Sequence, residues 1–431
     1  ITNLAGSFDV GDVAIAYNST DNQYATVWWG DTTTDNKFEI HVQIVNAATN
    51  VNVGGKTAVS NYDTVDLTSD APRFPSIAYN SDDNEYLVVW RQDITGSGND
   101  KEVFGAVLNA DGSVKVSPFQ ISELNGGTRT GRDAVHTGVT YNATNDEYLV
   151  VWSGDGEDAV GDLNQFEVYG QRVSAAGAEV GSDFKISDSG VTQAAQWVRT
   201  PSVAYDSTTG KYLAVWEQSP PATNYEAEIF GQLLNGADGS DDGTEFQISD
   251  ALSVASNRDA KNPAVAYNSN DNGYLVVWYG NQFGGSTEGH VGGNLVTSAG
   301  AVTPANNFQI SDAATSTYDD PPQDVNIAYN PLLNEYAVTW ASSVKLDRVS
   351  AAGTPGTDVT LSTDTVVPGD GGTESPRVVD VALNAANNSY FAVWAADPDT
   401  DGIKDMYGKV QALPAVYAVA QTAYSVAESA G

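Results

Sequence analysis

The sequence predicts an all-β protein, a seven-bladed β-propeller of four-stranded antiparallel blades that is closed by the N-terminal strand. Three observations support this fold class. One stretch of sequence recurs about every 62 residues, as expected when a single supersecondary unit is repeated along a chain. Each copy holds four short β-prone runs separated by turn residues, and no segment has sustained helical periodicity. The copies are counted by their landmark tryptophans, which are Trp28, Trp90, Trp152, Trp216, Trp278, Trp340 and Trp394.

The first two runs of each copy are predicted to form a tight hairpin. In the second copy, residues 75–80 are a short apolar run and residues 81–84 are the polar turn Ser-Asp-Asp-Asn. Residues 85–90 are a second apolar run that ends at the landmark tryptophan. Asn, Asp and Ser accept turn conformations that β-branched residues do not. We name these runs strands A and B, with strand A innermost in the ring.

The third and fourth runs of each copy complete the blade. In the second copy, residues 102–108 form a third run with a glycine in its middle, and residues 119–122 (Phe-Gln-Ile-Ser) form the fourth. The glycine predicts a β-bulge or close packing beneath an aromatic ring. Four antiparallel strands in each unit are the blade of a β-propeller. We name these runs strands C and D.

The two ends of the repeat region predict how the ring closes. The seventh copy has its third run at residues 406–413, but no Phe-x-Ile-Ser motif follows it. The chain starts about where a fourth strand would lie. We therefore expect residues 1–4 to complete blade seven as a molecular clasp. Residues 1–413 then form one propeller domain, and residues 414–431 are a C-terminal extension.

The charge and composition exclude several classes of function. The chain has 19 Lys plus Arg against 56 Asp plus Glu, a formal net charge of −37. Such a surface repels nucleic acid and anionic membranes and favours divalent cations. There is no cysteine and therefore no disulfide framework. No stretch approaches the roughly 18 apolar residues needed to cross a bilayer, so we expect neither nucleic-acid partners nor membrane insertion. Because Ile1 is not a methionine, we expect a processed or excised piece of a longer precursor.

The long connections are expected to gather on one face of the ring. In a propeller the A–B and C–D turns share one face, and the B–C and D–A connections share the other. Here the B–C and D–A connections often exceed about ten residues and are acidic and glycine-rich, and loops on a rigid scaffold often carry function. We call their side the elaborated face. Blade six has almost no B–C loop at residues 340–344, which predicts a notch there or a deletion that the ring tolerates.

One of these connections, residues 397–405, has the spacing of a calcium loop. Carboxylates at alternate positions, a glycine at the sixth position and an acid at the ninth can wrap one hard cation. The loop resembles the calcium loops of dockerins, thrombospondin-type repeats and the FG-GAP blades of integrin propellers. The resemblance implies a Ca²⁺ site with the carbonyl of Ile403 and four side chains as ligands, which are Asp397, Asp399, Asp401 and Asp405. Gly408 stands where an EF-hand has its bidentate Glu, so a solvated acidic loop is the alternative.

A second set of candidate residues is basic or aromatic. Basic residues occur five positions before the alanine of the Ala-Tyr-Asn motif in four copies, as Arg73, Arg199, Lys261 and Arg377. At the start of strand A they could surround the mouth of the central channel and bind an anionic sugar or carboxylate. Alternatively, each pairs with an aspartate of the adjoining blade. Trp197, beside Arg199 in a D–A loop, is the candidate for an exposed aromatic contact, whereas the landmark tryptophans are expected in the core.

Signals for catalysis are weak. His41, His136 and His290 are far apart in the sequence, and no Gly-x-Ser-x-Gly elbow, phosphate loop or sialidase-type Asp box is present. A carboxylate pair for glycoside cleavage needs only a suitable separation, and among 56 acids some pair will have it. A polysaccharide hydrolase or lyase with carboxylates at the channel mouth is therefore one alternative function.

The four motifs of the repeat also resemble those of a known family. Pro-x-Val-Ala-Tyr-Asn, Tyr-Leu-Val-Val-Trp, Glu-Ile-Phe-Gly-Gln and Phe-Gln-Ile-Ser are similar to a repeat of large secreted and surface-bound bacterial proteins. The match covers about residues 10–413 and implies propeller blades, an extracellular or cell-surface setting and no established reaction. Residues 423–431 resemble the opening strand of a Calx-beta domain. The extension is thus a linker, the first strand of such a domain, or a strand that adds to a sheet edge of a neighbouring molecule.

These observations predict a non-enzymatic, calcium-stabilised extracellular propeller module that serves adhesion or assembly, for example as a filament subunit. Its expected partners are other copies of itself or neighbouring domains of a longer chain. A carbohydrate-binding module, with glycans as partners, is the second alternative.

Overall fold

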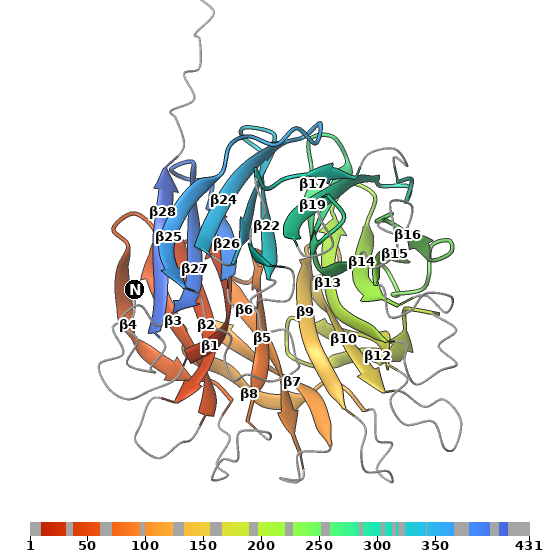
Figure 1. Ribbon diagram of the computed structural model, residues 1–431. Coiled ribbons are helices and arrows are strands. Elements are labelled where there is room, and N and C mark those ends of the chain that lie inside the picture. The colour runs from red at the N-terminus through yellow and green to blue at the C-terminus, as the bar shows by residue number, and fades with distance from the viewer. Residues whose placement is uncertain are drawn as a thin grey trace, which may run out of the picture.

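The predicted all-β class is confirmed in the computed structural model. The structure describes residues 10–31, 38–60, 71–94, 100–123, 133–155, 166–188, 197–219, 227–250, 259–283, 288–302, 307–312, 316–317, 324–341, 343–365, 379–396 and 405–412. These residues form seven antiparallel sheets arranged in a ring (Figure 1) and contain no helix. Accordingly, the described ranges hold no helix of the length and hydropathy that crossing a membrane requires.

The strands follow the predicted order within each blade. The A strands are β1 (Val10–Asn18), β5 (Arg73–Asn80), β9 (Ala134–Asn142), β13 (Val198–Asp206), β17 (Ala260–Asn268), β22 (Val325–Asn330) and β26 (Val379–Asn384). The B strands are β2 (Gln23–Asp31), β6 (Glu85–Asp93), β10 (Glu147–Asp155), β14 (Lys211–Gln218), β18 (Gly273–Gly280), β23 (Glu335–Trp340) and β27 (Ser389–Ala396). The C strands are β3 (Phe38–Asn46), β7 (Lys101–Asn109), β11 (Phe166–Ser174), β15 (Glu228–Asn235), β19 (Glu288–Thr297), β24 (Ser343–Ser350) and β28 (Asp405–Ala412).

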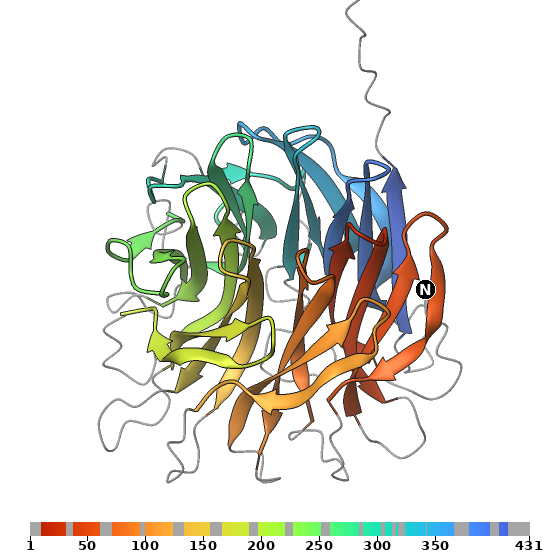
Figure 2. The ribbon, with the colours of Figure 1, turned by 180° about the vertical axis from the view of Figure 1, so that it is seen from behind.

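The D strands form the outside of the ring, as the view from behind also shows (Figure 2). They are β4 (Val51–Ala58), β8 (Val114–Gln120), β12 (Glu179–Lys185), β16 (Phe246–Gln247), β20 (Phe308–Gln309) and β25 (Val359–Thr365). A short strand β21 (Ser316–Thr317) also pairs with β19. Blade seven contributes β26, β27 and β28. Its predicted fourth strand, residues 1–4, lies outside the described residues.

The ring closes between blade one and blade seven. Strand β1 packs against both β5 and β26, and one apolar cluster combines Val13 and Trp28 of blade one with Phe391 and Val393 of blade seven. The main chain is also tied across this junction, because the Ile15 amide donates to a carboxylate oxygen of Asp380 at 2.9 Å. The first and last blades are therefore joined in the same way as sequential neighbours.

The landmark tryptophans form the core between blades, as predicted. Six of the seven have 0% exposed surface, and Trp394 has 4%. Each lies in a cluster that joins its own blade to the preceding one; Trp90, for example, packs with Val27 and Ile40 of blade one. Burial of such large side chains is a main stabilising term in a fold. The repeat of tryptophan is therefore a repeat of the blade interface.

The asparagine that ends strand A also joins blades. In blade two the side-chain oxygen of Asn80 accepts the amides of Asp82 and Asp83 at 2.8 and 2.9 Å, which forms the turn. Its amide group donates to Asp146 of blade three at 3.1 Å. The acceptor residue has a positive φ of 53°, a conformation that Asn and Asp tolerate. Equivalent bonds to the next blade are made by Asn18, Asn268 and Asn330.

Strands C and D are held together by their two motifs. The Ser122 hydroxyl accepts the Val103 amide at 2.8 Å and donates to the Glu102 carboxylate. Blades three and four repeat this pair as Ser187 with Glu167 and Ser249 with Glu228. The glycine in the middle of strand C lies at a bulge, as predicted. A Cβ at Gly105 would lie 2.7 Å from Ile121 and 3.4 Å from Phe119, so close packing at this position is confirmed as well.

The A–B and C–D turns lie on one face, because main-chain hydrogen bonds join them. The Gly236 amide donates to the Gly210 carbonyl at 2.8 Å, and the Ala47 amide donates to the Asn22 carbonyl at 3.0 Å. The start of every A strand is at the opposite, elaborated face. In blade six, β23 ends at Trp340 and β24 begins at Ser343. The B–C connection there is as short as the sequence predicts.

Candidate functional site

The described residues at the elaborated end of the central channel form a ring of β-bulges. In blades one to five, strand A has one non-glycine residue with a left-handed backbone, with φ between 36° and 52°; these are Asp12, Phe74, His136, Thr200 and Asn262. Each lies where the pairing of strands A and B shifts. A positive φ is rare for β-branched or bulky residues, and bulges redirect side chains, often beside functional sites. The ring therefore marks a candidate site.

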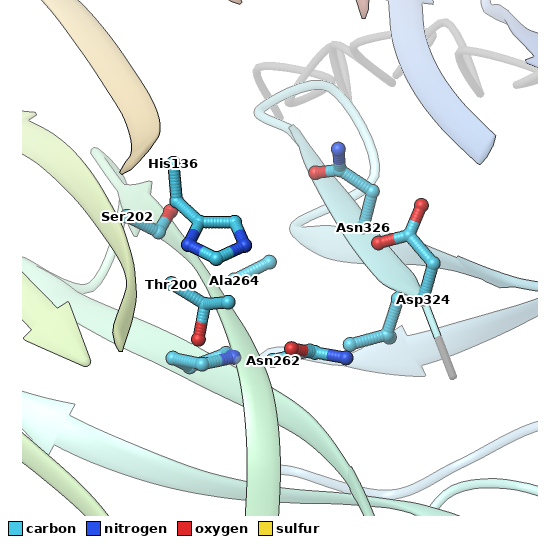
Figure 3. Close-up of a pocket in the computed structure, with 9 residues that line it drawn as sticks. His136, Thr200, Ser202, Asn262, Ala264, Asp324 and Asn326 are labelled. Atoms are coloured by element: carbon cyan, nitrogen blue, oxygen red, sulfur yellow. The ribbon is translucent and has the colours of Figure 1, made fainter. Parts of the chain in front are cut away.

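A small pocket lies inside this ring, between the A strands of blades three to six. Its volume is about 40 Å³. Figure 3 shows an imidazole, hydroxyls, amides and one carboxylate around the same space, from His136, Thr200, Ser202, Asn262, Asp324 and Asn326. The first three belong to blades three and four, and the last three to blades five and six. The sequence-based reasoning missed this set, although Thr200 and Asn262 directly follow the basic residues that it selected.

Buried carboxylates near the channel accept main-chain amides of the next blade. Asp324, 6% exposed, accepts the Val379 amide at 3.0 Å. Glu217, also 6% exposed, accepts the Asn262 amide at 2.9 Å and the Thr200 hydroxyl at 3.2 Å. Because a bulge frees amides from strand pairing, an acceptor from the neighbouring blade satisfies them. These acids connect blades at the channel mouth.

The predicted basic residues are close to the ring but do not line the pocket. Arg73 is 7% exposed, and its guanidinium lies 5.1 Å from the ring centroid of Trp29 in the preceding blade. Lys261 forms an ion pair with Asp259 at 2.9 Å. Arg377 lies outside the described residues. Ligand binding by these residues stays a prediction.

Trp197 and Arg199 come together at the start of β13. The Arg199 guanidinium is 5.5 Å from the centroid of the Trp197 ring, and the arginine is exposed while the tryptophan is half-buried. The main chain at Trp197 is fixed to the end of strand B, because its carbonyl accepts the Ser219 amide at 3.0 Å. The pair thus presents an aromatic ring and a cation on the elaborated face, where the sequence places a candidate contact.

The predicted calcium loop lies mostly outside the described residues. This applies to Asp397, Asp399, Asp401 and Ile403, whereas Asp405 is the first residue of β28. Across the ranges that the structure describes, no three acidic or histidine side chains converge in a way that could hold a metal ion. The Ca²⁺ site therefore stays a prediction for residues 397–405.

The three histidines lie in different blades. His41 is 3% exposed, and its Nε2 is 3.2 Å from the carbonyl oxygen of Gly30. Burial lowers the pKa of His41 to about 4, with the nearby Lys56 ammonium contributing in the same direction. His136 packs against the Phe74 ring at a centroid distance of 4.6 Å. His290 is 5% exposed and lies beside Phe283 in blade five.

With this geometry the chain is, as a class, a seven-bladed β-propeller. Its sequence matches no protein-family model and no curated protein. Its fold is similar to that of the β-propeller domain of the trilobed protease from Pyrococcus furiosus, with a TM-score of 0.50 and 11% identity over 96% of this chain and 99% of that one. An α-L-arabinofuranosidase from Fusarium graminearum, solved with an iminosugar inhibitor, gives a TM-score of 0.52 and 9% identity over 94% of this chain and 96% of that one. A Hadza microbial sialidase gives a TM-score of 0.50 and 8% identity over 86% of this chain and 74% of that one. At these identities the likeness shows the fold alone, and function has to be argued from the site.

Proposed function

We propose that this chain is a non-enzymatic propeller module of a secreted or surface-bound bacterial protein, stabilised by calcium and serving adhesion or assembly. One observation carries the proposal: the acids beside the described channel pocket, Asp324 and Glu217, accept main-chain amides of the next blade. A carboxylate that is needed to hold the ring together is poorly placed to exchange protons with a substrate. These contacts therefore support a scaffold role for the blades, with partner molecules binding to the loops.

The size of the channel pocket supports the same proposal. At about 40 Å³ it has room for one or two waters, whereas small-molecule sites usually have about 300–1,000 Å³. The extracellular setting and the calcium rest on the resemblance of the repeat and of residues 397–405 to secreted proteins and calcium loops.

Calcium removal tests the metal part of the proposal. We expect the melting temperature of the chain to fall when EDTA replaces millimolar Ca²⁺, because a ligand at about 100 times its dissociation constant stabilises a fold by about 2.7 kcal/mol. In a variant with Asp399→Asn and Asp401→Asn, the two melting temperatures should coincide. Asp111→Asn, which changes one exposed acid in a blade-two turn, is the control and should keep the calcium shift. If EDTA does not change the melting temperature of the wild type, the calcium part of the proposal is contradicted.

Electron microscopy of the purified chain in Ca²⁺ tests assembly. We expect filaments or ordered oligomers from the full chain and single propellers after deletion of residues 414–431, because that extension is the proposed intermolecular strand. Single propellers in both samples would contradict assembly and leave adhesion as the role. Release of reducing ends from a polysaccharide, abolished by Asp324→Asn, would instead support the hydrolase alternative.

Carbohydrate binding on the elaborated face is the second candidate function. The observation that favours it is the pair of Trp197 and Arg199, since an aromatic ring beside an exposed guanidinium is a common way to contact a sugar.

A further inference from the structure

A larger groove lies on the outer rim, between blades three and four and on the side of the A–B and C–D turns. Its volume is about 480 Å³. One wall is the outer strand β12, and the other is the C–D connection of blade four, residues 236–245. The side chains that matter for its chemistry are Arg172, Ser182, Phe184, Lys185, Asp238 and Asp241. The groove has the size of a ligand site and lies away from the elaborated face.

The blade-four wall consists of the C–D turn and the residues that lead to β16. Compared with blade two, blade four has one extra residue in this turn, Gly236, and the stretches between the turn glycine and the phenylalanine, residues 113–118 and 240–245, are equal in length. The turn is well held. The Asp238 carboxylate accepts the Ser240 amide at 3.0 Å and its hydroxyl at 2.6 Å, and the Gly239 amide donates to Asn235 at 2.8 Å. The groove wall is therefore formed before any ligand arrives.

Gly239 fixes this wall against blade three. Its φ is +80°, and a Cβ at this position would lie 2.6 Å from the Phe184 ring. In the preceding junction the equivalent residue is Gly177, where a Cβ would lie 3.1 Å from the Phe119 ring. The same contact thus holds both junctions, and Ser240 and Asp241 follow it directly as part of the groove wall.

The blade-three wall carries two cations, of which Lys185 is the one that departs from the repeat, whereas Arg172 has an equivalent in Arg348 of blade six. Lys185 stands where Gln120, Gln247 and Gln309 stand in the other Phe-x-Ile-Ser motifs, and 37% of its side chain is exposed. Arg172 is held in place, because its Nη1 donates to the Glu147 carboxylate and to the Ala237 carbonyl at 2.9 Å. A Cβ at Gly181 would lie 3.9 Å from Nη2 of Arg172, so this second amino group lies along β12.

The blade-four wall carries two acids. Hydrogen bonds from Ser240 lower the pKa of Asp238, which is a carboxylate at neutral pH. Burial raises the pKa of Asp241, with the nearby Asp188 contributing in the same direction. Donors on one wall thus lie opposite acceptors on the other. Arg172 also pairs with Glu147 at 3.2 Å and Lys185 with Asp188 at 3.5 Å, in a protein of net charge −37.

This arrangement fits a ligand rich in hydroxyl groups. A hydroxyl donates to a carboxylate and accepts from an ammonium or guanidinium at the same time, so a sugar can connect the two walls. A polyanion would be repelled by the protein as a whole. A peptide would need apolar side-chain pockets, but the apolar lining here is Val180 and the Phe184 ring that Gly239 covers. We propose that the groove between β12 and residues 236–245 binds a neutral oligosaccharide. The proposal goes beyond calcium binding and assembly and does not rest on either.

The full chain should be screened on an array of neutral and uronic-acid oligosaccharides, followed by calorimetric titration with the tightest neutral binder. We expect binding to weaken about tenfold in Lys185→Gln, which restores the residue of the other blades, and in Asp238→Ala. Asp111→Ala is the matched control. It breaks the same turn in blade two, where Ser113 donates to Asp111 at 2.9 and 2.6 Å, and it should bind like the wild type.

Trp197→Ala separates this groove from the elaborated face. The proposal is overturned if no neutral oligosaccharide binds, if Lys185→Gln and Asp238→Ala bind as tightly as Asp111→Ala, or if only Trp197→Ala loses binding. A preference for the uronic-acid ligands, or for unrelated peptides in the same titration, would also overturn it.

Discussion

Replacing Trp90 with alanine should lower the free energy of unfolding by about 3–5 kcal/mol, the usual cost of removing a large aromatic side chain from a packed core. Trp90 has 0% exposed surface and lies in the cluster between blades one and two. Its indole nitrogen also donates to Gln92 at 3.1 Å, and this bond is lost in the variant. Guanidinium unfolding followed by far-UV circular dichroism measures the change.

Leu332→Ala is the control for this measurement. Leu332 lies in the A–B turn of blade six with 58% of its surface exposed, so its truncation should change the unfolding free energy by less than about 0.5 kcal/mol. A cost below about 1 kcal/mol for Trp90→Ala would mean that the blades relax around the gap, and that the tryptophan repeat contributes less to the ring than its burial implies.

The repeat made the architecture predictable from the sequence, because each motif performs the same physical task in every blade. The landmark tryptophans, the asparagine at the end of strand A and the glycine of strand C all lie where their residue types predict. One copy alone would have left the strands ambiguous, since short apolar runs fit either a strand or a buried helix. The period resolved the ambiguity.

The channel site was not predictable in the same way. Phe74 and Thr200 each precede a proline, and a residue before proline is expected to be extended, yet both have a positive φ, of 52° and 50°. A bulge changes which side chain faces the channel. This is why Thr200 lines the pocket while Arg199, one residue earlier, lies over Trp197. Residue types along the chain do not encode that shift.

The outer groove was missed for a different reason. Its walls come from segments more than 50 residues apart in the sequence, around Lys185 and Asp238. The signal that could have found it is Lys185, which stands where three other Phe-x-Ile-Ser motifs have glutamine. Departures from the repeat therefore indicate candidate sites better than the repeat itself.

Replacing Asn142 with alanine should cost about 2–4 kcal/mol of unfolding free energy, more than the loss of an ordinary turn residue. Asn142 is 1% exposed, and its oxygen accepts the amides of Thr144 and Asn145 at 2.9 and 3.2 Å. Its amide group donates to the Tyr212 hydroxyl at 2.8 Å and to the Gly236 carbonyl at 3.1 Å, both in blade four. The variant removes the bond to the Tyr212 hydroxyl and the acceptor of the two turn amides, whereas the Gly236 carbonyl keeps the Asn145 side chain as a donor at 2.8 Å. Each buried group that stays unsatisfied costs about 1–3 kcal/mol.

Asn46→Ala is the control that separates the cost of losing a turn from the cost of losing a contact between blades. Asn46 forms the same kind of turn, accepting the amides of Ala48 and Thr49 at 3.0 and 2.9 Å. Within the described residues its hydrogen bonds stay inside its own blade. Its truncation should therefore cost only about 1 kcal/mol. The difference between the two variants, measured by the same guanidinium unfolding, is the contribution of one contact between blades. Equal costs would show that the asparagine repeat maintains turns and does not hold the ring together.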